Sequence, residues 1–115
     1  MDRRKELKEQ YKNMKPEMGI FIIKAKFNDK CLIESSKDLK STINGSKFRL
    51  KSSNHLNNSL QQDWIKYGEE SFNVEILENL QYDKDESKMD YSEELEILKL
   101  IWIERLSKQG IEFYI

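Results

Sequence analysis

The segment GIFIIKAKFNDKCLIESSKDL, residues 19–39, decides the fold, because it predicts a β-hairpin that runs into a helix. Residues 20–23 are apolar and largely β-branched, and beyond them lysines alternate with apolar side chains, as in a strand. Asn28 and Asp29 follow, two residue types that tolerate the positive φ of a tight hairpin turn. The run KCLI, residues 30–33, then returns as the partner strand.

A helix is expected directly after this hairpin. Ser35 or Ser36 is placed to cap it, with Asp38 in its first turn, where the helix dipole favours a carboxylate. Gly45 follows Asn44, and it either ends the helix or weakens its middle.

The next elements are a second helix and a third strand. The helix is predicted from about residue 57 to residue 67, with Gly68 in the position of a C-terminal cap. Residues 72–77 alternate in polarity, so we expect a strand in which Val74 and Ile76 face inward.

A polar, acidic loop over residues 81–90 separates this strand from a last helix. Asp90 and Glu93 resemble a capping box, Gly110 ends the helix, and residues 111–115 are expected to form a short closing strand. The spacing of apolar residues in all these elements predicts eight core residues. They are Phe21, Leu32, Leu60, Trp64, Val74, Ile76, Leu98 and Trp102.

The chain of 115 residues is expected to form one main domain over residues 17–115. Residues 1–16 predict an extra amphipathic helix that either docks on the domain or binds a protein partner. Cys31 is the single cysteine, which excludes an internal disulfide, and we see no signal sequence, so we expect a cytoplasmic protein. No apolar run approaches the roughly 20 residues that span a bilayer, so no membrane role is expected.

Charge is unevenly distributed along the chain. Residues 24–66 carry nine Lys or Arg against four acids, a net charge of +5. Residues 78–96 carry eight acids against two lysines, a net charge of −6. A basic middle segment suits a phosphate-rich partner such as DNA or RNA, although an uneven solvated surface has the same composition.

The order of elements and three strings of sequence resemble the GIY-YIG nuclease family over roughly residues 18–106. The most specific of the three is the middle one, in which a Leu-Gln pair, Trp64 and a Tyr-Gly precede a strand that contains EILE. The strings are GIFIIKAKFNDKCLIESSKDL, NHLNNSLQQDWIKYGEESFNVEILENL and LKLIWIERL. The resemblance implies an α+β fold with a small three-stranded antiparallel sheet flanked by helices.

The resemblance also implies a nuclease site with one divalent metal, and this chain departs from it at almost every position. In the family a tyrosine helps to activate water, a helix arginine stabilises phosphate charge and a glutamate holds the metal. Glu34 replaces the glycine of the second motif. The two tyrosines, the arginine, a histidine and the glutamate fall on Phe21, Leu32, Thr42, Ser46 and Lys99, and the one retained residue is His55.

Each replacement removes a chemical function. Phenylalanine and leucine cannot exchange a proton, threonine cannot supply charge to a phosphate, and lysine repels a metal cation. We therefore expect no catalytic residues, no metal site and no cofactor. A residual nuclease would need Mg²⁺ at a relocated site built from other carboxylates, for which the chain offers Glu34, Glu94, Glu96 and Glu104.

Two further functions stay open beside the residual nuclease. The first, which the charge distribution favours, is a non-catalytic GIY-YIG-like domain that binds nucleic acid weakly through a basic groove. The second is a protein-interaction or regulatory module that uses the N-terminal helix and the acidic loop. The residues expected to line the groove are Lys47, Arg49, Lys51, His55, Asn57 and Asn58.

Overall fold

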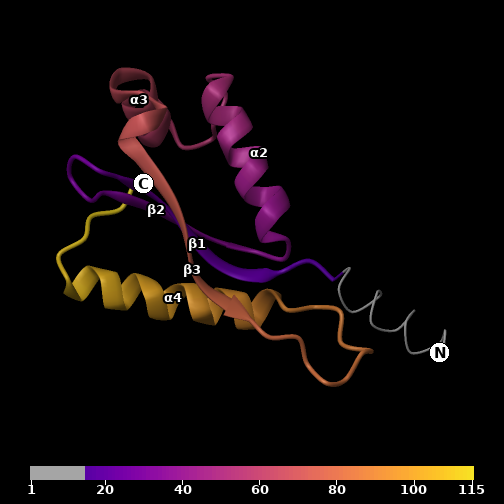
Figure 1. The fold of residues 1–115 in the computed structure, drawn as a ribbon. Coiled ribbons are helices and arrows are strands. Elements are labelled where there is room, and N and C mark those ends of the chain that lie inside the picture. Colours follow the sequence, from indigo (N-terminus) through magenta and orange to yellow (C-terminus); the bar gives the residue numbers. More distant parts are fainter. Residues whose placement is uncertain (1–14) are drawn as a thin grey trace, which may run out of the picture.

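The computed structural model describes residues 15–115 and shows a three-stranded antiparallel sheet between two layers of helices (Figure 1). The strand order is β2-β1-β3, so the first strand lies in the centre. Helices α2 and α3 cover one face of the sheet and α4 covers the other. The elements are β1 (Met18–Ala25), β2 (Cys31–Ser36), α2 (Leu39–Lys51), α3 (Asn58–Tyr67), a 3₁₀ turn (Glu69–Ser71), β3 (Phe72–Leu80) and α4 (Ser92–Lys108).

The predicted hairpin is confirmed. β1 and β2 pair antiparallel, and the backbone amide of Ala25 donates to the carbonyl of Lys30 at 2.9 Å to close the turn. Asp29 adopts a φ of 59°, the positive value that its residue type tolerates. The amphipathic helix predicted over residues 1–16 falls almost entirely on residues 1–14, which lie outside the described part of the chain.

The helix after the hairpin differs from the prediction at its start, and its course through Gly45 decides between the two roles that the sequence left open for that glycine. Its N-cap is Asp38, whose carboxylate accepts from the amide of Ser41 at 3.1 Å, while the hydroxyl of Ser36 accepts from the amide of Asp38. The helix then continues through Gly45 to Lys51. A glycine inside a helix costs only about 1 kcal/mol, and burial of Leu50 beyond it outweighs that cost.

The second helix agrees with the prediction at both ends. The carboxamide oxygen of Asn57 accepts from the amide of Leu60 at 3.0 Å and caps the N-terminus of α3. Gly68 has a φ of 85°, and its amide donates to the carbonyl of Trp64 at 2.9 Å. These local signals sufficed because neither cap depends on a distant part of the chain.

Strand β3 exists but contains an irregularity that the alternation rule could not show. Ile20 pairs with Glu78 while Phe21 pairs with Ile76, so Leu77 has no partner in β1. Ile76 is 48% exposed, which makes its assignment to the core wrong. Next to this bulge the central strand passes very close to β3, and a Cβ on Gly19 would lie 2.0 Å from the carbonyl oxygen of Glu78.

Two apolar layers, one on each face of the sheet, form most of the core. Phe21, Leu32, Leu60 and Trp64 are buried in the layer beneath α2 and α3, as predicted, and Val74 packs at its margin. Leu98 and Trp102 are partly buried in the layer beneath α4. The core prediction is thus confirmed for four residues in full and for three in part.

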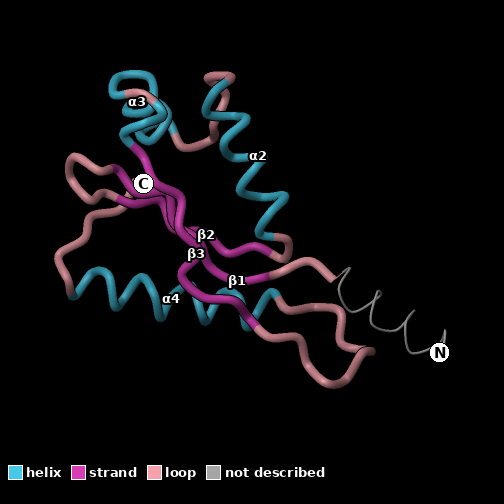
Figure 2. The backbone as a smooth tube through the Cα atoms, in the orientation of Figure 1, coloured by secondary structure: helices cyan, strands magenta, loops and turns pink. Residues whose placement is uncertain are grey.

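The C-terminal segment returns from α4 to the edge of the sheet (Figure 2). It forms a single parallel bridge between Cys31 and Phe113 rather than the predicted strand. Two backbone hydrogen bonds hold it, from the amide of Cys31 to Glu112 and from the amide of Tyr114 to Cys31.

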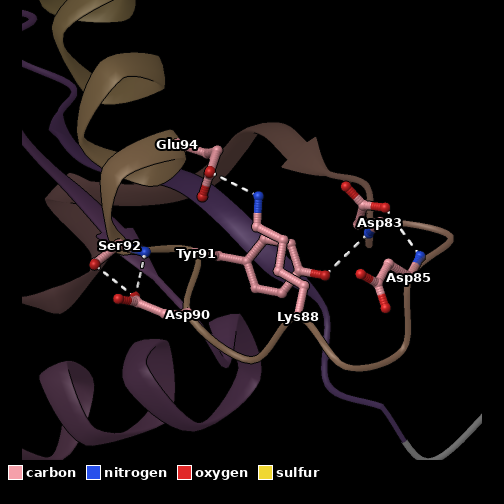
Figure 3. Close-up of polar contacts among 7 residues, drawn as sticks. All are labelled: Asp83, Asp85, Lys88, Asp90, Tyr91, Ser92 and Glu94. Atoms are coloured by element: carbon pink, nitrogen blue, oxygen red, sulfur yellow. Dashed lines mark hydrogen bonds and ion pairs between the residues drawn. The ribbon is translucent and has the colours of Figure 1, made fainter.

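The loop before α4 is ordered by polar contacts (Figure 3). The ammonium group of Lys88 lies 2.8 Å from the carboxylate of Glu94 and 5.0 Å from the ring centre of Tyr91. Asp90 accepts from the amide and the hydroxyl of Ser92, so the predicted capping box with a glutamate is wrong. Of the helices in residues 15–115, none combines the length and the apolar character needed to cross a membrane.

Candidate functional site

A cleft of about 590 Å³ lies between β2, α2 and the loop that leads to α3. Its walls come from four parts of the chain that the fold brings together. They are Leu32 and Glu34 of β2; Ser41, Thr42, Gly45, Ser46 and Arg49 of α2; and His55, Leu56, Asn57, Asn58 and Ile115.

Five of the seven positions that correspond to the nuclease motifs line this cleft. They are Leu32, Glu34, Thr42, Ser46 and His55. Phe21 pairs with Glu34 across the hairpin, and its ring is fully buried in the core, so it is not at the surface of the cleft. Lys99 is on α4, on the other face of the sheet, and does not line the cleft.

Thr42 occupies the position of the family's arginine, and its hydroxyl group forms a hydrogen bond with another residue of the domain. The Oγ1 atom of Thr42 lies 2.6 Å from the Oγ of Ser36, a buried residue at the end of β2. That same Oγ accepts from the amide of Asp38, so Ser36 joins the strand to the first turn of α2. Thr42 therefore helps to fix the helix on the sheet.

His55 is buried and forms specific hydrogen bonds. Its Nδ1 atom accepts from the amide of Asn57 at 3.0 Å, which places the proton of the neutral ring on Nε2. Burial lowers the pKa of His55 below its ordinary value; the carboxylate of Glu34 opposes this shift and the guanidinium of Arg49 adds to it. His55 is thus a neutral hydrogen-bonding group at pH 7, with its acceptor nitrogen already occupied.

Gln61 holds the loop that carries this histidine. Its side chain is buried, its Oε1 accepts from the amide of His55 at 2.9 Å, and its Nε2 donates to the carbonyl of Leu50 at 3.0 Å. The contact joins the end of α2 to the start of α3. Gln61 was not predicted to play this role. The available signal was a polar residue beside Leu60 on the apolar side of α3.

The charges of the cleft are few. Glu34 and Arg49 are the charged side chains among its lining residues, and their two charges sum to zero. Within residues 15–115, no group of three His, Cys, Asp or Glu side chains is placed to hold a metal ion. A Mg²⁺ ion at a phosphate is commonly held by one or two carboxylates together with water and phosphate oxygens, and Glu34 is the one carboxylate side chain among the residues that line the cleft.

The six residues predicted to line a basic groove divide into two sets. Arg49, His55, Asn57 and Asn58 do line the cleft. Lys47 and Lys51 do not, and the ammonium group of Lys51 lies 3.3 Å from the carboxylate of Glu69. The reason is helical geometry, because side chains two positions apart point to different sides of a helix.

Sequence families, curated proteins and solved structures provide three comparisons for this chain. No sequence-family profile matches the chain, and no curated protein matches it either. Among solved structures, the catalytic domain of the homing endonuclease I-TevI is similar, with 27% sequence identity and a TM-score of 0.65. That similarity covers 84% of this chain and 95% of the other. This chain belongs to the GIY-YIG superfamily.

A second structure of the same domain, a glutamate-to-alanine mutant of the intron endonuclease I-TevI, gives a similar result. It is 26% identical with a TM-score of 0.64, and the match covers 84% of this chain and 90% of the mutant. The expected α+β fold, with a three-stranded antiparallel sheet flanked by helices, is confirmed. The cleft of this GIY-YIG domain is formed at the positions that the motifs indicated.

Proposed function

We propose that this chain is a non-catalytic GIY-YIG domain that binds nucleic acid through α2 and the cleft beside it. The observation that carries the proposal is the composition of α2. This helix contains Lys40, Lys47, Arg49 and Lys51 and no acidic residue, and it forms one wall of the cleft.

The absence of catalysis is proposed from the chemistry of the cleft. Leu32 offers no proton, Thr42 is held by Ser36, and His55 is neutral with one ring nitrogen engaged. Cleavage of a phosphodiester needs a nucleophile, a Lewis acid and a cation at the developing charge. Arg49 supplies the last of these and no lining residue supplies the first two.

The binding mode follows from where the cations lie. Lys40 and Lys47 are exposed and seven residues apart, so they share one side of α2, turned away from the cleft that Arg49 lines, and can contact phosphates of a strand that passes over the helix. Arg49 and Asn58 are exposed at the cleft and can reach a phosphate and a sugar or base edge. The binding should be weak and largely indifferent to sequence, because lysine contacts to phosphate carry no sequence information.

A salt titration tests the binding. Labelled DNA and RNA oligonucleotides are titrated with the protein from about 50 mM salt upwards, since each neutralised phosphate adds about −0.9 to the slope of log affinity against log salt. A variant with Lys40, Lys47 and Arg49 changed to Gln should bind more weakly and with a slope flatter by about two to three units. Absence of binding to either nucleic acid at about 50 mM would overturn the proposal and leave the interaction module as the better account.

A matched variant controls for net charge. Changing Lys66, Lys84 and Lys99 to Gln removes the same charge from α3, the acidic loop and α4. If binding depends on α2, this control should keep most of the affinity and nearly the full salt slope. An equal loss in both variants would show that only the net charge matters and that α2 is not the contact surface.

Catalysis is tested separately. The protein is incubated with plasmid and labelled oligonucleotides in Mg²⁺ and in Mn²⁺, and we expect no cleavage above background. Cleavage that EDTA abolishes and that Glu34→Gln removes would show a working site in the cleft and would contradict the non-catalytic half of the proposal.

A further inference from the structure

Helix α4 has apolar residues on the side that faces away from the sheet. Its inner side packs on the sheet through residues such as Leu98 and Trp102. On the opposite side Ile97, Leu100 and Ile101 are 52%, 54% and 40% exposed. Their spacing of three and four residues places them on one face of the helix, where they form a continuous patch.

A helix that is apolar on both sides is typical of one that is buried on both sides. The outer layer of this domain ends at α4, and nothing else among residues 15–115 packs over the patch (Figure 1). The patch is central on the 17 residues of the helix, so a second helix laid along α4 would cover it. We call Ile97, Leu100 and Ile101 the outer patch of α4.

The charges on α4 favour one partner and one direction. The segment 92–98 carries three glutamates and no cation, while 99–108 carries three cations against Glu104. A second α4 packed antiparallel sets each acidic half against a basic half, and the two helix dipoles also oppose each other favourably. A parallel arrangement would set acid against acid.

We infer that two copies of this chain associate through the outer patch of α4, with the two helices antiparallel about a twofold axis. Such an isologous contact is self-complementary, since the same three apolar residues face their counterparts. Glu93 of one copy then lies near Lys108 of the other. A contact made by one helix is small, so the dimer is weak and depends on concentration.

Sedimentation velocity from about 1 µM to 1 mM, the range of weak protein complexes, tests the association. The unmodified chain should shift from monomer towards dimer across this range. Leu100→Glu should raise the dissociation constant by about tenfold or more, because it buries a charge against its own counterpart at the twofold axis. Ile65→Glu is the matched control, since Ile65 is 64% exposed on α3, and it should dimerise like the parent.

Charge reversal tests the direction. Glu93→Lys and Lys108→Glu should each weaken the dimer, and the double variant should restore it to within about twofold, as complementary charges do. Circular dichroism confirms that each variant is folded. A chain that stays monomeric to about 1 mM, or a dimer that Leu100→Glu leaves intact, overturns the inference, and a dimer indifferent to both reversals overturns its antiparallel form.

Discussion

Replacement of Gln61 by leucine tests whether the wall of the cleft depends on one buried side chain. The amide of Gln61 is engaged at both ends, accepting from the backbone of His55 and donating to the backbone of Leu50. Leucine has a similar volume, so little cavity forms and the change isolates the polar contacts. It leaves the buried amide of His55 without a partner and removes one of the hydrogen bonds that the carbonyl of Leu50 accepts, another coming from the amide of Ser53 at 3.2 Å.

The magnitude follows from these two contacts. A typical hydrogen bond contributes about 1 kcal/mol to folding, and a buried polar group left without a partner costs about 1–3 kcal/mol. The carbonyl of Leu50 keeps its hydrogen bond from the amide of Ser53, which reduces the sum. We expect Gln61→Leu to lower the free energy of unfolding by about 2–4 kcal/mol, a large part of the 5–15 kcal/mol of an ordinary domain.

Urea denaturation followed by tryptophan fluorescence measures this, because Trp64 lies in the core three residues beyond Gln61. Gln62→Leu is the control: Gln62 is exposed on the same helix, and its substitution should change stability by less than about 0.5 kcal/mol. Gln61→Glu keeps an acceptor for His55 but sets a carboxylate against a carbonyl, so it should also destabilise. If Gln61→Leu stays within about 0.5 kcal/mol of the parent, the assignment of these contacts is refuted.

Three further predictions concern the glycines, the histidine and the acidic loop. Gly19→Ala should cost more than about 2 kcal/mol in urea unfolding, because its Cβ would overlap a backbone carbonyl. Gly45→Ala meets open space inside a helix and should stabilise by about 0.5–1 kcal/mol. His55 has a folded pKa below its unfolded value, so the unfolded state binds a proton first and stability should fall as pH drops below about 6.5. NMR titration of this single histidine and a flatter profile in His55→Asn check it. The hydrogen bond from Lys88 lowers the pKa of Glu94, and the stability it contributes is lost as pH falls through that lowered pKa; Lys88→Met should move the Glu94 pKa back up in carboxyl NMR.

The parts of the fold that could be predicted from sequence were those with local causes. The turn at Asp29 and the C-terminal cap at Gly68 each follow from a residue and its near neighbours, and both are found where expected. The start of α2 was misplaced because Ser36 is drawn into contacts with both Asp38 and a helix residue, which no local rule contains.

The remaining errors came from the tertiary level. Ile76 follows the alternation of a strand and pairs with Phe21, but β3 is an edge strand of the sheet and the side chain is 48% exposed there. The sequence left open whether Gly45 ends α2 or lies within it, and burial of Leu50 beyond the glycine favours the longer helix. Register and burial both depend on which element lies opposite, and a single sequence does not state this.

The candidate site shows the same division. Leu32, Thr42, Ser46 and His55, which the motif spacing assigned to one site, line the same cleft. The groove residues were taken from a run of basic residues in sequence, and a helix turns Lys47 and Lys51 away from Arg49. No motif predicts that the side chains of Gln61 and Ser36 form hydrogen bonds that connect separate elements of the fold.

Three polar side chains of the cleft form hydrogen bonds within the fold, and these bonds limit the chemistry that the three groups can perform. Thr42 bonds to Ser36, Nδ1 of His55 to a backbone amide, and the carboxamide oxygen of Asn57 to the first turn of α3. A group held in this way cannot shift to meet a reacting phosphate without weakening the wall that carries it. The exposed guanidinium of Arg49 and the exposed ammonium groups of Lys40 and Lys47 can attract an anion without transforming it. The hydrogen bonds of Thr42, His55 and Asn57 thus stabilise the wall of the cleft in this domain.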